Sequence, residues 1–135
     1  APEPAAQLRG LVLVADDNID AAWSVARLLE RTGYSTLKAR TGTGALDTIR
    51  QHRPDAAVLD VGMPGMDGHE VARQVRAADW GRQMALIAVT GWGQDADERQ
   101  SLQAGFDAHL TKPVDVSRLS SLIDSLVARK RASPK

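Results

Sequence analysis

Five polar residues stand where apolar runs of the sequence end, and together their side chains could bind a cation and a phosphate group. They are Asp16, Asp17, Asp60, Thr90 and Lys112. Three carboxylates held close together repel one another, and a divalent cation relieves that repulsion. Mg²⁺ suits such a cluster because it takes oxygen ligands and commonly combines one or two carboxylates with a phosphate oxygen. The lysine ammonium and the threonine hydroxyl would then bind the remaining oxygens of a phosphoryl group.

Taken singly, each of these residues also has an ordinary structural interpretation. Asp16 and Asp17 could cap a helix, because an aspartate before a helix accepts a hydrogen bond from a free backbone amide. The stretch from Asp60 to Gly68 is rich in Pro and Gly and could be only a loop. Thr90 could end a strand, and Lys112 could lie in a solvated turn. No His or Cys lies near them at the spacing of a zinc site, so the joint pattern favours oxygen coordination.

Short apolar runs alternate with amphipathic stretches along the chain and indicate five strands and five helices. The predicted strands are Leu11–Ala15, Ser35–Ala39, Ala56–Leu59, Met84–Val89 and Ala108–Leu110. The predicted helices are Ile19–Arg31, Gly44–Gln51, Glu70–Ala78, Asp95–Ala104 and Val116–Arg131. Gly33 and Gly105 each follow a helix at the position where a left-handed cap favours glycine.

Strands that alternate with helices predict an α/β fold, because right-handed crossovers then place helices on both faces of a parallel sheet. The leading topology is a flavodoxin-like (βα)₅ doubly wound sheet with five strands in the order 2-1-3-4-5. Ligands of such sheets bind beyond the carboxyl ends of the strands. The five polar residues would therefore meet at one edge of the sheet.

The composition indicates one globular domain without a strong charge bias. The 135 residues include 17 Lys and Arg against 17 Asp and Glu, and no cysteine. Disulfides are excluded, and no global field would draw the chain to nucleic acid or to an acidic membrane. The apolar runs are too short for a membrane span and no signal peptide precedes them, so we expect a cytoplasmic location. We expect a linker or flank at residues 1–8, the domain at 9–131 and a tail at 132–135.

In this order and at these strand ends, the residues resemble the receiver domain of two-component response regulators, from about Leu11 to Arg129. The motifs that carry the resemblance are Asp16-Asp17, Asp60-Val61-Gly62-Met63-Pro64-Gly65-Met66-Asp67-Gly68, Val89-Thr90-Gly91 and Leu110-Thr111-Lys112-Pro113. The resemblance implies that Asp60 accepts a phosphoryl group from the phosphohistidine of a histidine kinase or a histidine phosphotransfer domain. The chain would then be a signalling domain with self-catalysed phosphotransfer and autodephosphorylation, and not otherwise an enzyme.

The resemblance also implies a set of roles for the polar residues. The carboxylates of Asp17 and Asp60 and the carbonyl of Gly62 would bind Mg²⁺ directly, and Asp16 would hold it through water. Thr90 and Lys112 would contact the phosphoryl group. The bond between Lys112 and Pro113 would be cis, an isomer found almost only before proline.

Two positions depart from the commonest receiver pattern. His109 stands where many receivers carry a switching Tyr or Phe, so it is either part of a switch or an exposed residue at a strand end. Trp92 follows Thr90 closely and either covers the mouth of the site or only packs on the surface. The segments 89–94 and 104–110 are similar to receivers attached to hybrid histidine kinases. His52 and His69 are expected to be solvated.

Three other functions compete with this interpretation. A phosphatase that works through an aspartyl phosphate needs a second aspartate two residues after its nucleophile, and Gly62 occupies that position. A flavodoxin-like cofactor protein would need a glycine-rich phosphate loop after the first strand, which this sequence lacks. A degenerate receiver that only binds other proteins is disfavoured by the intact set of acidic, threonine and lysine residues. Neither nucleic acid nor a membrane is an expected partner.

Overall fold

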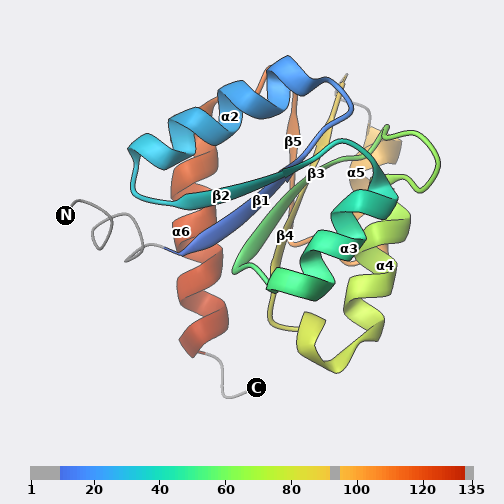
Figure 1. Cartoon of the computed structure of the whole chain (residues 1–135). Coiled ribbons are helices and arrows are strands. Elements are labelled where there is room, and N and C mark those ends of the chain that lie inside the picture. The colour runs from blue at the N-terminus through green and yellow to red at the C-terminus, as the bar shows by residue number, and fades with distance from the viewer. Residues whose placement is uncertain (1–9, 92–94, 133–135) are drawn as a thin grey trace.

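A five-stranded parallel sheet with helices on both faces positions the polar residues (Figure 1). The structure is a computed structural model, and it describes residues 10–91 and 95–132. The elements are β1 (Leu11–Ala15), α2 (Ile19–Arg31), β2 (Ser35–Ala39), α3 (Gly42–His52), β3 (Ala56–Asp60), α4 (Gly68–Ala77), the short 3₁₀ helix η1 (Asp79–Gly81), β4 (Ala85–Thr90), α5 (Asp95–Ala104), β5 (Ala108–Thr111) and α6 (Val116–Ala132). The strand order β2-β1-β3-β4-β5 confirms the predicted flavodoxin-like topology.

The strand boundaries differ from the predicted ones in a way that matters for the site. β3, β4 and β5 each extend one residue further than predicted, so Asp60 and Thr90 are the last residues of their strands rather than the first residues of loops. β4 begins at Ala85, one residue after the predicted Met84. The side chains of Asp60 and Thr90 therefore project from hydrogen-bonded strand backbone, which fixes their positions better than a loop would.

Two helices begin earlier than the sequence pattern predicts, because polar side chains cap them ahead of a glycine. Thr41 caps α3 by accepting the N–H of Gly44 at 3.0 Å. Asp67 caps α4 by accepting the N–H of Glu70 at 3.0 Å. These capping bonds stabilise the first turn, although its glycines disfavour a helix. α6 also runs one residue beyond the predicted end, to Ala132.

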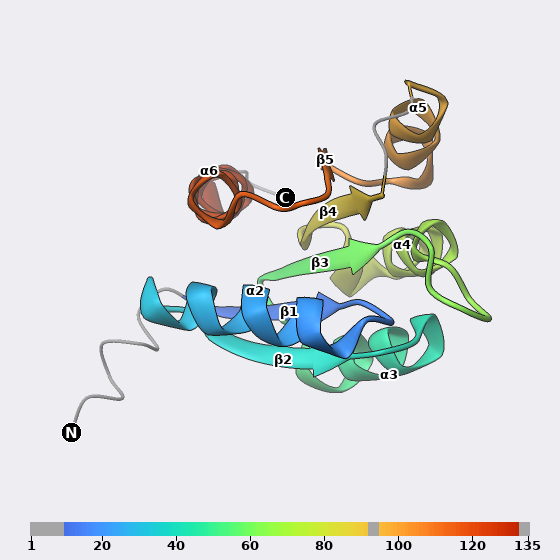
Figure 2. The same cartoon turned by 90° about the horizontal axis from the view of Figure 1, so that it is seen from above.

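Burial explains the continuous apolar runs in the sequence. Every residue of β3 and β4 is buried, because helices cover both faces of the central strands. One apolar cluster joins the sheet to α3 and α4, and a second joins it to α2 and α6. Figure 2 shows these two helical layers on opposite sides of the sheet. Gly33 and Gly105 adopt the expected left-handed backbone, with φ of 105° and 115°.

A polar network secures the sheet at the end opposite to the carboxyl ends of the strands. The Arg76 guanidinium donates hydrogen bonds to the carbonyls of Gly81, Met84 and Gly105, at 2.8, 2.7 and 2.8 Å. The guanidinium also forms an ion pair with the Asp107 carboxylate at 2.9 Å. The same carboxylate forms a second ion pair with the ammonium of Lys130 at 3.0 Å. α4, β4 and α6 are thus tied together away from the site. Within residues 10–91 and 95–132, no helix is both long and apolar enough to cross a membrane.

Candidate functional site

Capping of α2 by Asn18 leaves the two preceding aspartates available for the site. The Asn18 side chain accepts the N–H of Ala21 at 3.1 Å, so Asn18 is the N-cap. Asp16 accepts the N–H of Asn18 with Oδ1 at 2.9 Å, which orients its carboxylate. Oδ2 of Asp16 remains for other partners. The capping interpretation of Asp16 and Asp17 is therefore wrong, because the following residue performs that task.

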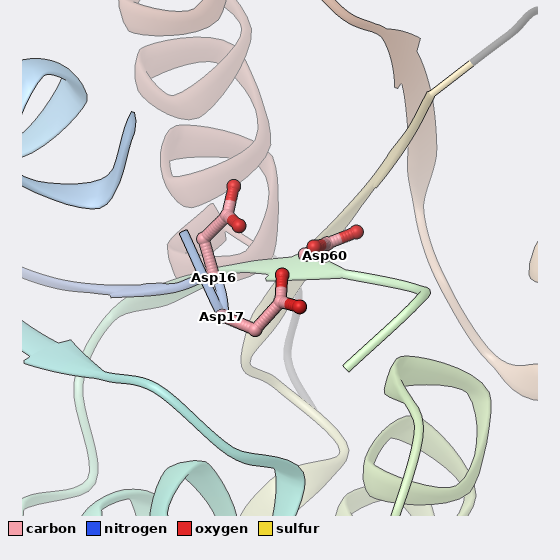
Figure 3. A group of neighbouring side chains, drawn as sticks. All are labelled: Asp16, Asp17 and Asp60. Atoms are coloured by element: carbon pink, nitrogen blue, oxygen red, sulfur yellow. The ribbon is translucent and has the colours of Figure 1, made fainter. Parts of the chain in front are cut away.

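The three predicted carboxylates meet at the carboxyl ends of β1 and β3 (Figure 3). One oxygen from each of Asp16, Asp17 and Asp60 lies within 4.8 Å of the others. The parallel register brings this about, since Ala15 at the end of β1 is paired with Leu59, the residue before Asp60. Asp16 and Asp60 are buried, at 7% and 6% exposure, whereas Asp17 faces solvent. The cluster therefore has a buried floor and an open side.

Lys112 provides the positive charge of the site. Its Nζ lies 3.2 Å from Oδ2 of Asp16 and 3.3 Å from Oδ2 of Asp60. The N–H of Gly62 donates to the other oxygen of Asp60 at 3.1 Å, so both oxygens of that carboxylate have donors. The Lys112–Pro113 peptide bond is cis, as the resemblance implies. Lys112, which directly follows β5, thus bridges the carboxylate of Asp16, just after β1, and that of Asp60 at the end of β3.

Burial and neighbouring charges move the pKa values of this pair. Burial raises the pKa of Asp60, the Gly62 N–H lowers it, the Asp16 carboxylate raises it and Lys112 lowers it, with a net rise above the ordinary value. Burial lowers the pKa of Lys112, but the charges of Asp60 and Asp16 outweigh burial and leave that pKa raised. Lys112 is thus a firm cation at neutral pH, while an ionised Asp60 costs folding free energy.

We expect Asp60→Asn to melt at a higher temperature than the wild type at neutral pH without Mg²⁺. Because the folded pKa of Asp60 lies above its unfolded value, the stability linked to this group is present below the unfolded pKa. It is lost as pH rises through the folded pKa. The amide carries no charge, so it avoids that loss and should raise the melting temperature by a few degrees.

Thermal unfolding followed by circular dichroism from acid to neutral pH measures this effect. The difference between Asp60→Asn and wild type should shrink on acidification, when Asp60 itself becomes neutral. Asp47→Asn, an exposed change of the same kind in α3, is the matched control and should melt like the wild type. A metal-free Asp60→Asn protein that melts below the wild type at neutral pH would contradict the assigned direction.

Thr90 and His109 form a second polar pair beside the carboxylates. Thr90, at the end of β4, is 5% exposed, and its Oγ1 lies 3.0 Å from Nε2 of His109 in β5. His109 is half-buried and turned toward Thr90. The interpretation of His109 as an exposed strand-end residue is therefore wrong. Trp92 lies outside the described residues.

The other two histidines have different environments. His52 is exposed, as expected. His69 is only 8% exposed, so the expectation that it is solvated is wrong. Its Nε2 lies 3.1 Å from Oγ of the fully buried Ser101, and its ring meets Phe106 edge-on. A polar partner on another helix allows this histidine to lie in the interior, and the sequence pattern gave no sign of that partner.

Gly68, which the Pro- and Gly-rich pattern placed in a loop, is the first residue of α4 and lies against the end of β3. A Cβ at this position would lie 2.9 Å from the carbonyl oxygen of Asp60 and 3.0 Å from Cα of Val61. Only glycine lets the first turn of α4 approach the carboxyl end of β3 this closely. The signal was present in the sequence as a glycine directly after the Asp67 cap, but its reason lies in tertiary packing.

The arrangement fits a hard divalent cation together with a tetrahedral anion. Carboxylate oxygens are ligands that Mg²⁺ prefers, and the exposed side at Asp17 leaves room for water ligands. Lys112 and Thr90 come from the neighbouring ends of β5 and β4, which are paired at Thr90 and Thr111. The site therefore offers a carboxylate nucleophile, a place for a cation and two donors for phosphoryl oxygens.

Comparison with known proteins finds a family match that covers most of the chain. Residues 12–124 match the family model described as the response regulator receiver domain. The polar-differentiation response regulator DivK of Brucella anthropi is 35% identical over 114 residues, which cover 84% of this chain and 93% of that protein. The family-model match thus includes β2 to β5, β1 from Val12 onward, and the residues gathered at the carboxyl ends of the strands.

Two solved structures have a closely similar fold. The signal receiver domain of a signal transduction histidine kinase from Syntrophus aciditrophicus has a TM-score of 0.83 and 30% identity, covering 93% of this chain and 96% of that one. The receiver domain of a sensor histidine kinase from Pseudomonas aeruginosa has a TM-score of 0.81 and 27% identity, covering 88% and 98%. The latter contains a magnesium ion coordinated in its active-site cleft.

Proposed function

The chain belongs to the family of response regulator receiver domains, phosphoacceptors of two-component signalling, and on this premise we propose that Asp60 is its phosphoacceptor. The observation that carries the proposal is the surroundings of the Asp60 carboxylate. It is buried at the end of β3, its Oδ2 meets Lys112 at 3.3 Å, and it shares the site with Asp16 and Asp17. The proposed nucleophile, the Lys112 ammonium and the acidic cluster thus lie together.

The proposed reaction moves one phosphoryl group. An Asp60 carboxylate oxygen attacks phosphorus, an O–P bond forms, and the P–N bond of a phosphohistidine breaks. The electron pair of that bond returns to the imidazole nitrogen. Lys112 and the Thr90 hydroxyl donate to phosphoryl oxygens, which offsets the charge that gathers there during transfer. Water later attacks the acyl phosphate and restores the carboxylate.

We assign the cation site to the acidic cluster. Asp17, Asp60 and the Gly62 carbonyl would hold Mg²⁺ directly, and Asp16 would hold it through water. When bound, the ion neutralises charge between the carboxylates and the phosphoryl oxygens. Gly62 suits its part because its N–H already binds Asp60, which keeps its backbone at the site. The cluster consists of three aspartates and includes neither of the His and Cys ligands that dominate zinc sites.

A groove beside the site supports a protein as the phosphoryl donor. A hollow of about 260 Å³ lies between α2 and the segment after β5. Asp16 and Lys112 are among the residues that line it, and its apolar lining includes Val25, Leu28, Val114 and Val116. We infer that a helix of a histidine kinase or histidine phosphotransfer domain packs on this groove and presents its phosphohistidine to Asp60. A stand-alone regulator and a receiver within a hybrid kinase would use the same surface.

Incubation with acetyl phosphate and Mg²⁺, followed by intact mass spectrometry, tests the function. We expect the wild type to gain one phosphoryl group, to gain none when EDTA removes the metal, and to lose the group again over time. A protein that never gains mass would instead be a degenerate receiver that serves as an interaction platform. Rapid catalytic turnover of many phosphate molecules would support an aspartyl-phosphate phosphatase, for which Gly62 provides no general acid.

Replacement of Asp17 by asparagine should weaken Mg²⁺ binding by at least roughly tenfold, since it removes a charged ligand from the ion. Isothermal titration calorimetry measures the affinity. Asp20→Asn removes another exposed carboxylate, from the first turn of α2, and should bind Mg²⁺ like the wild type. Wild-type affinity should also fall on acidification, because protons compete for the same carboxylates. Equal affinities in the two variants would mean that the ion binds elsewhere.

A further inference from the structure

The imidazole of His109 lies directly against the hydroxyl of Thr90. Nε2 and Oγ1 are 3.0 Å apart, which is hydrogen-bonding distance. The two residues come from neighbouring parallel strands, in which His109 is paired with Ala88. Side chains of one strand alternate between faces, so Thr90, two residues after Ala88, shares a sheet face with His109. The contact therefore follows from the register of β4 and β5.

The Thr90 hydroxyl has a single hydrogen, which determines whether it can be the donor or the acceptor in its contact with His109. A hydroxyl has one hydrogen to donate and two lone pairs that accept. Under the function proposed above, the hydroxyl donates its hydrogen to a phosphoryl oxygen. It can then keep its bond to His109 only as an acceptor, and for that Nε2 must carry a hydrogen. If Nε2 were the acceptor, the hydroxyl hydrogen would point at the ring and away from Asp60.

We propose that His109 is a positioning residue for phosphoryl transfer, whose Nε2–H donates to Oγ1 of Thr90 and directs the Thr90 hydroxyl hydrogen at the phosphoryl group on Asp60. The inference rests on the proposed function and adds a residue to it. The result is a chain of two hydrogen bonds, from His109 through Thr90 to the phosphoryl oxygen. Each bond in such a chain polarises the next, so the hydroxyl becomes a better donor.

Two substitutions separate hydrogen bonding from packing at this position. His109→Gln retains an N–H at about the distance of Nε2 from the backbone, whereas His109→Phe retains a ring without a donor. His109 is half-buried in the edge strand β5, so both side chains have room. Circular dichroism and thermal melting check that both variants fold.

The first measurement is the rate of mass gain with acetyl phosphate and Mg²⁺. We expect His109→Phe to react roughly tenfold more slowly than the wild type, and His109→Gln to stay within about twofold of it. In a Thr90→Val background the Phe substitution should have no further effect, since the hydroxyl is already gone. Wild-type speed in His109→Phe, equal slowing in His109→Gln, or a persisting effect without the hydroxyl would each overturn the proposal.

The second measurement is ¹⁵N NMR of the histidine side chains with Mg²⁺ and beryllofluoride as the phosphoryl mimic. Nε2 of His109, assigned by its loss in His109→Gln, should carry a proton in the beryllofluoride complex. An unprotonated Nε2 in that complex would overturn the proposal. If Nε2 is unprotonated but the wild type still gains a phosphoryl group, the proposed function stands and only this inference is overturned. A wild type that neither gains mass nor responds to beryllofluoride would overturn the proposed function and this inference together.

Discussion

Asp60→Asn should gain no phosphoryl group from acetyl phosphate and Mg²⁺, under conditions in which the wild type gains one. The amide oxygen is a poor nucleophile and would not form a stable acyl phosphate, so the loss should be complete within detection. We expect no mass gain at Asp16 in its place, because under the proposed function that carboxylate helps to hold the cation and does not face the phosphoryl donor. Intact mass spectrometry over a time course measures the gain.

The control for this prediction is Asp47→Asn, an exposed carboxylate-to-amide change in α3, which should be phosphorylated like the wild type. Because Asp60→Asn is also expected to be at least as stable as the wild type, unfolding cannot explain its lost reactivity. An undiminished mass gain in Asp60→Asn would mean that another residue accepts the phosphoryl group.

The second large effect should come from Lys112→Met, which removes the charge of the site while keeping most of the side-chain length. We expect phosphorylation to slow by roughly 10²-fold, the loss typical of removing one donor that stabilises transferring oxygens. The same change frees the carboxylates of Asp16 and Asp60 from their shared cation, at 3.2 and 3.3 Å. The metal-free protein should therefore melt at a lower temperature than the wild type.

Two further variants show which property of Lys112 matters. Lys38→Met is the matched control, since Lys38 is an exposed residue of β2 whose ammonium lies over the Trp23 ring. It should be phosphorylated at the wild-type rate. Lys112→Arg keeps the charge but replaces a compact ammonium by a planar fork, so it should recover only part of the rate. A Lys112→Met protein as fast as the wild type would exclude Lys112 from the reaction.

The sequence predicted the sheet and the grouping of the site because both follow from short-range signals. The apolar runs that became β3 and β4 are continuous since both sheet faces are covered, and this pattern is visible without a structure. Once the strands are parallel, their carboxyl ends must meet at one edge. Asp16, Asp17 and Asp60 then lie together by topology alone, as the structure confirms.

The features that the sequence did not predict depend on contacts between distant elements. His69 resembles a surface residue in an amphipathic helix, and only the approach of Ser101 from α5 explains why it is buried. Arg53 adopts φ of 45°, where glycine is usual, with its guanidinium over the Trp80 ring at 5.0 Å. The sequence pattern placed Gly68 in a loop, but its lack of a side chain permits the close contact of α4 with β3. Register, side-chain direction and helix packing decide such cases.

The contact between Thr90 and His109 was predicted only in part from the sequence. Both residues were singled out from the sequence, but their contact required the register in which His109 is paired with Ala88. A shift of that register by one residue would place the imidazole on the other face of the sheet. The sequence thus suggested a special role for His109, and the strand register identified Thr90 as its partner.

Chemical trapping of the acyl phosphate tests the assignment of Asp60 most directly. Borohydride reduces an aspartyl phosphate to homoserine with release of phosphate, and peptide mass spectrometry then identifies the converted position. After treatment of the wild type with acetyl phosphate and Mg²⁺, homoserine should be found at position 60 alone, and at no position when EDTA is present. Conversion at Asp16 or Asp17 in place of Asp60, or a phosphoryl group that resides on a histidine, would contradict the account.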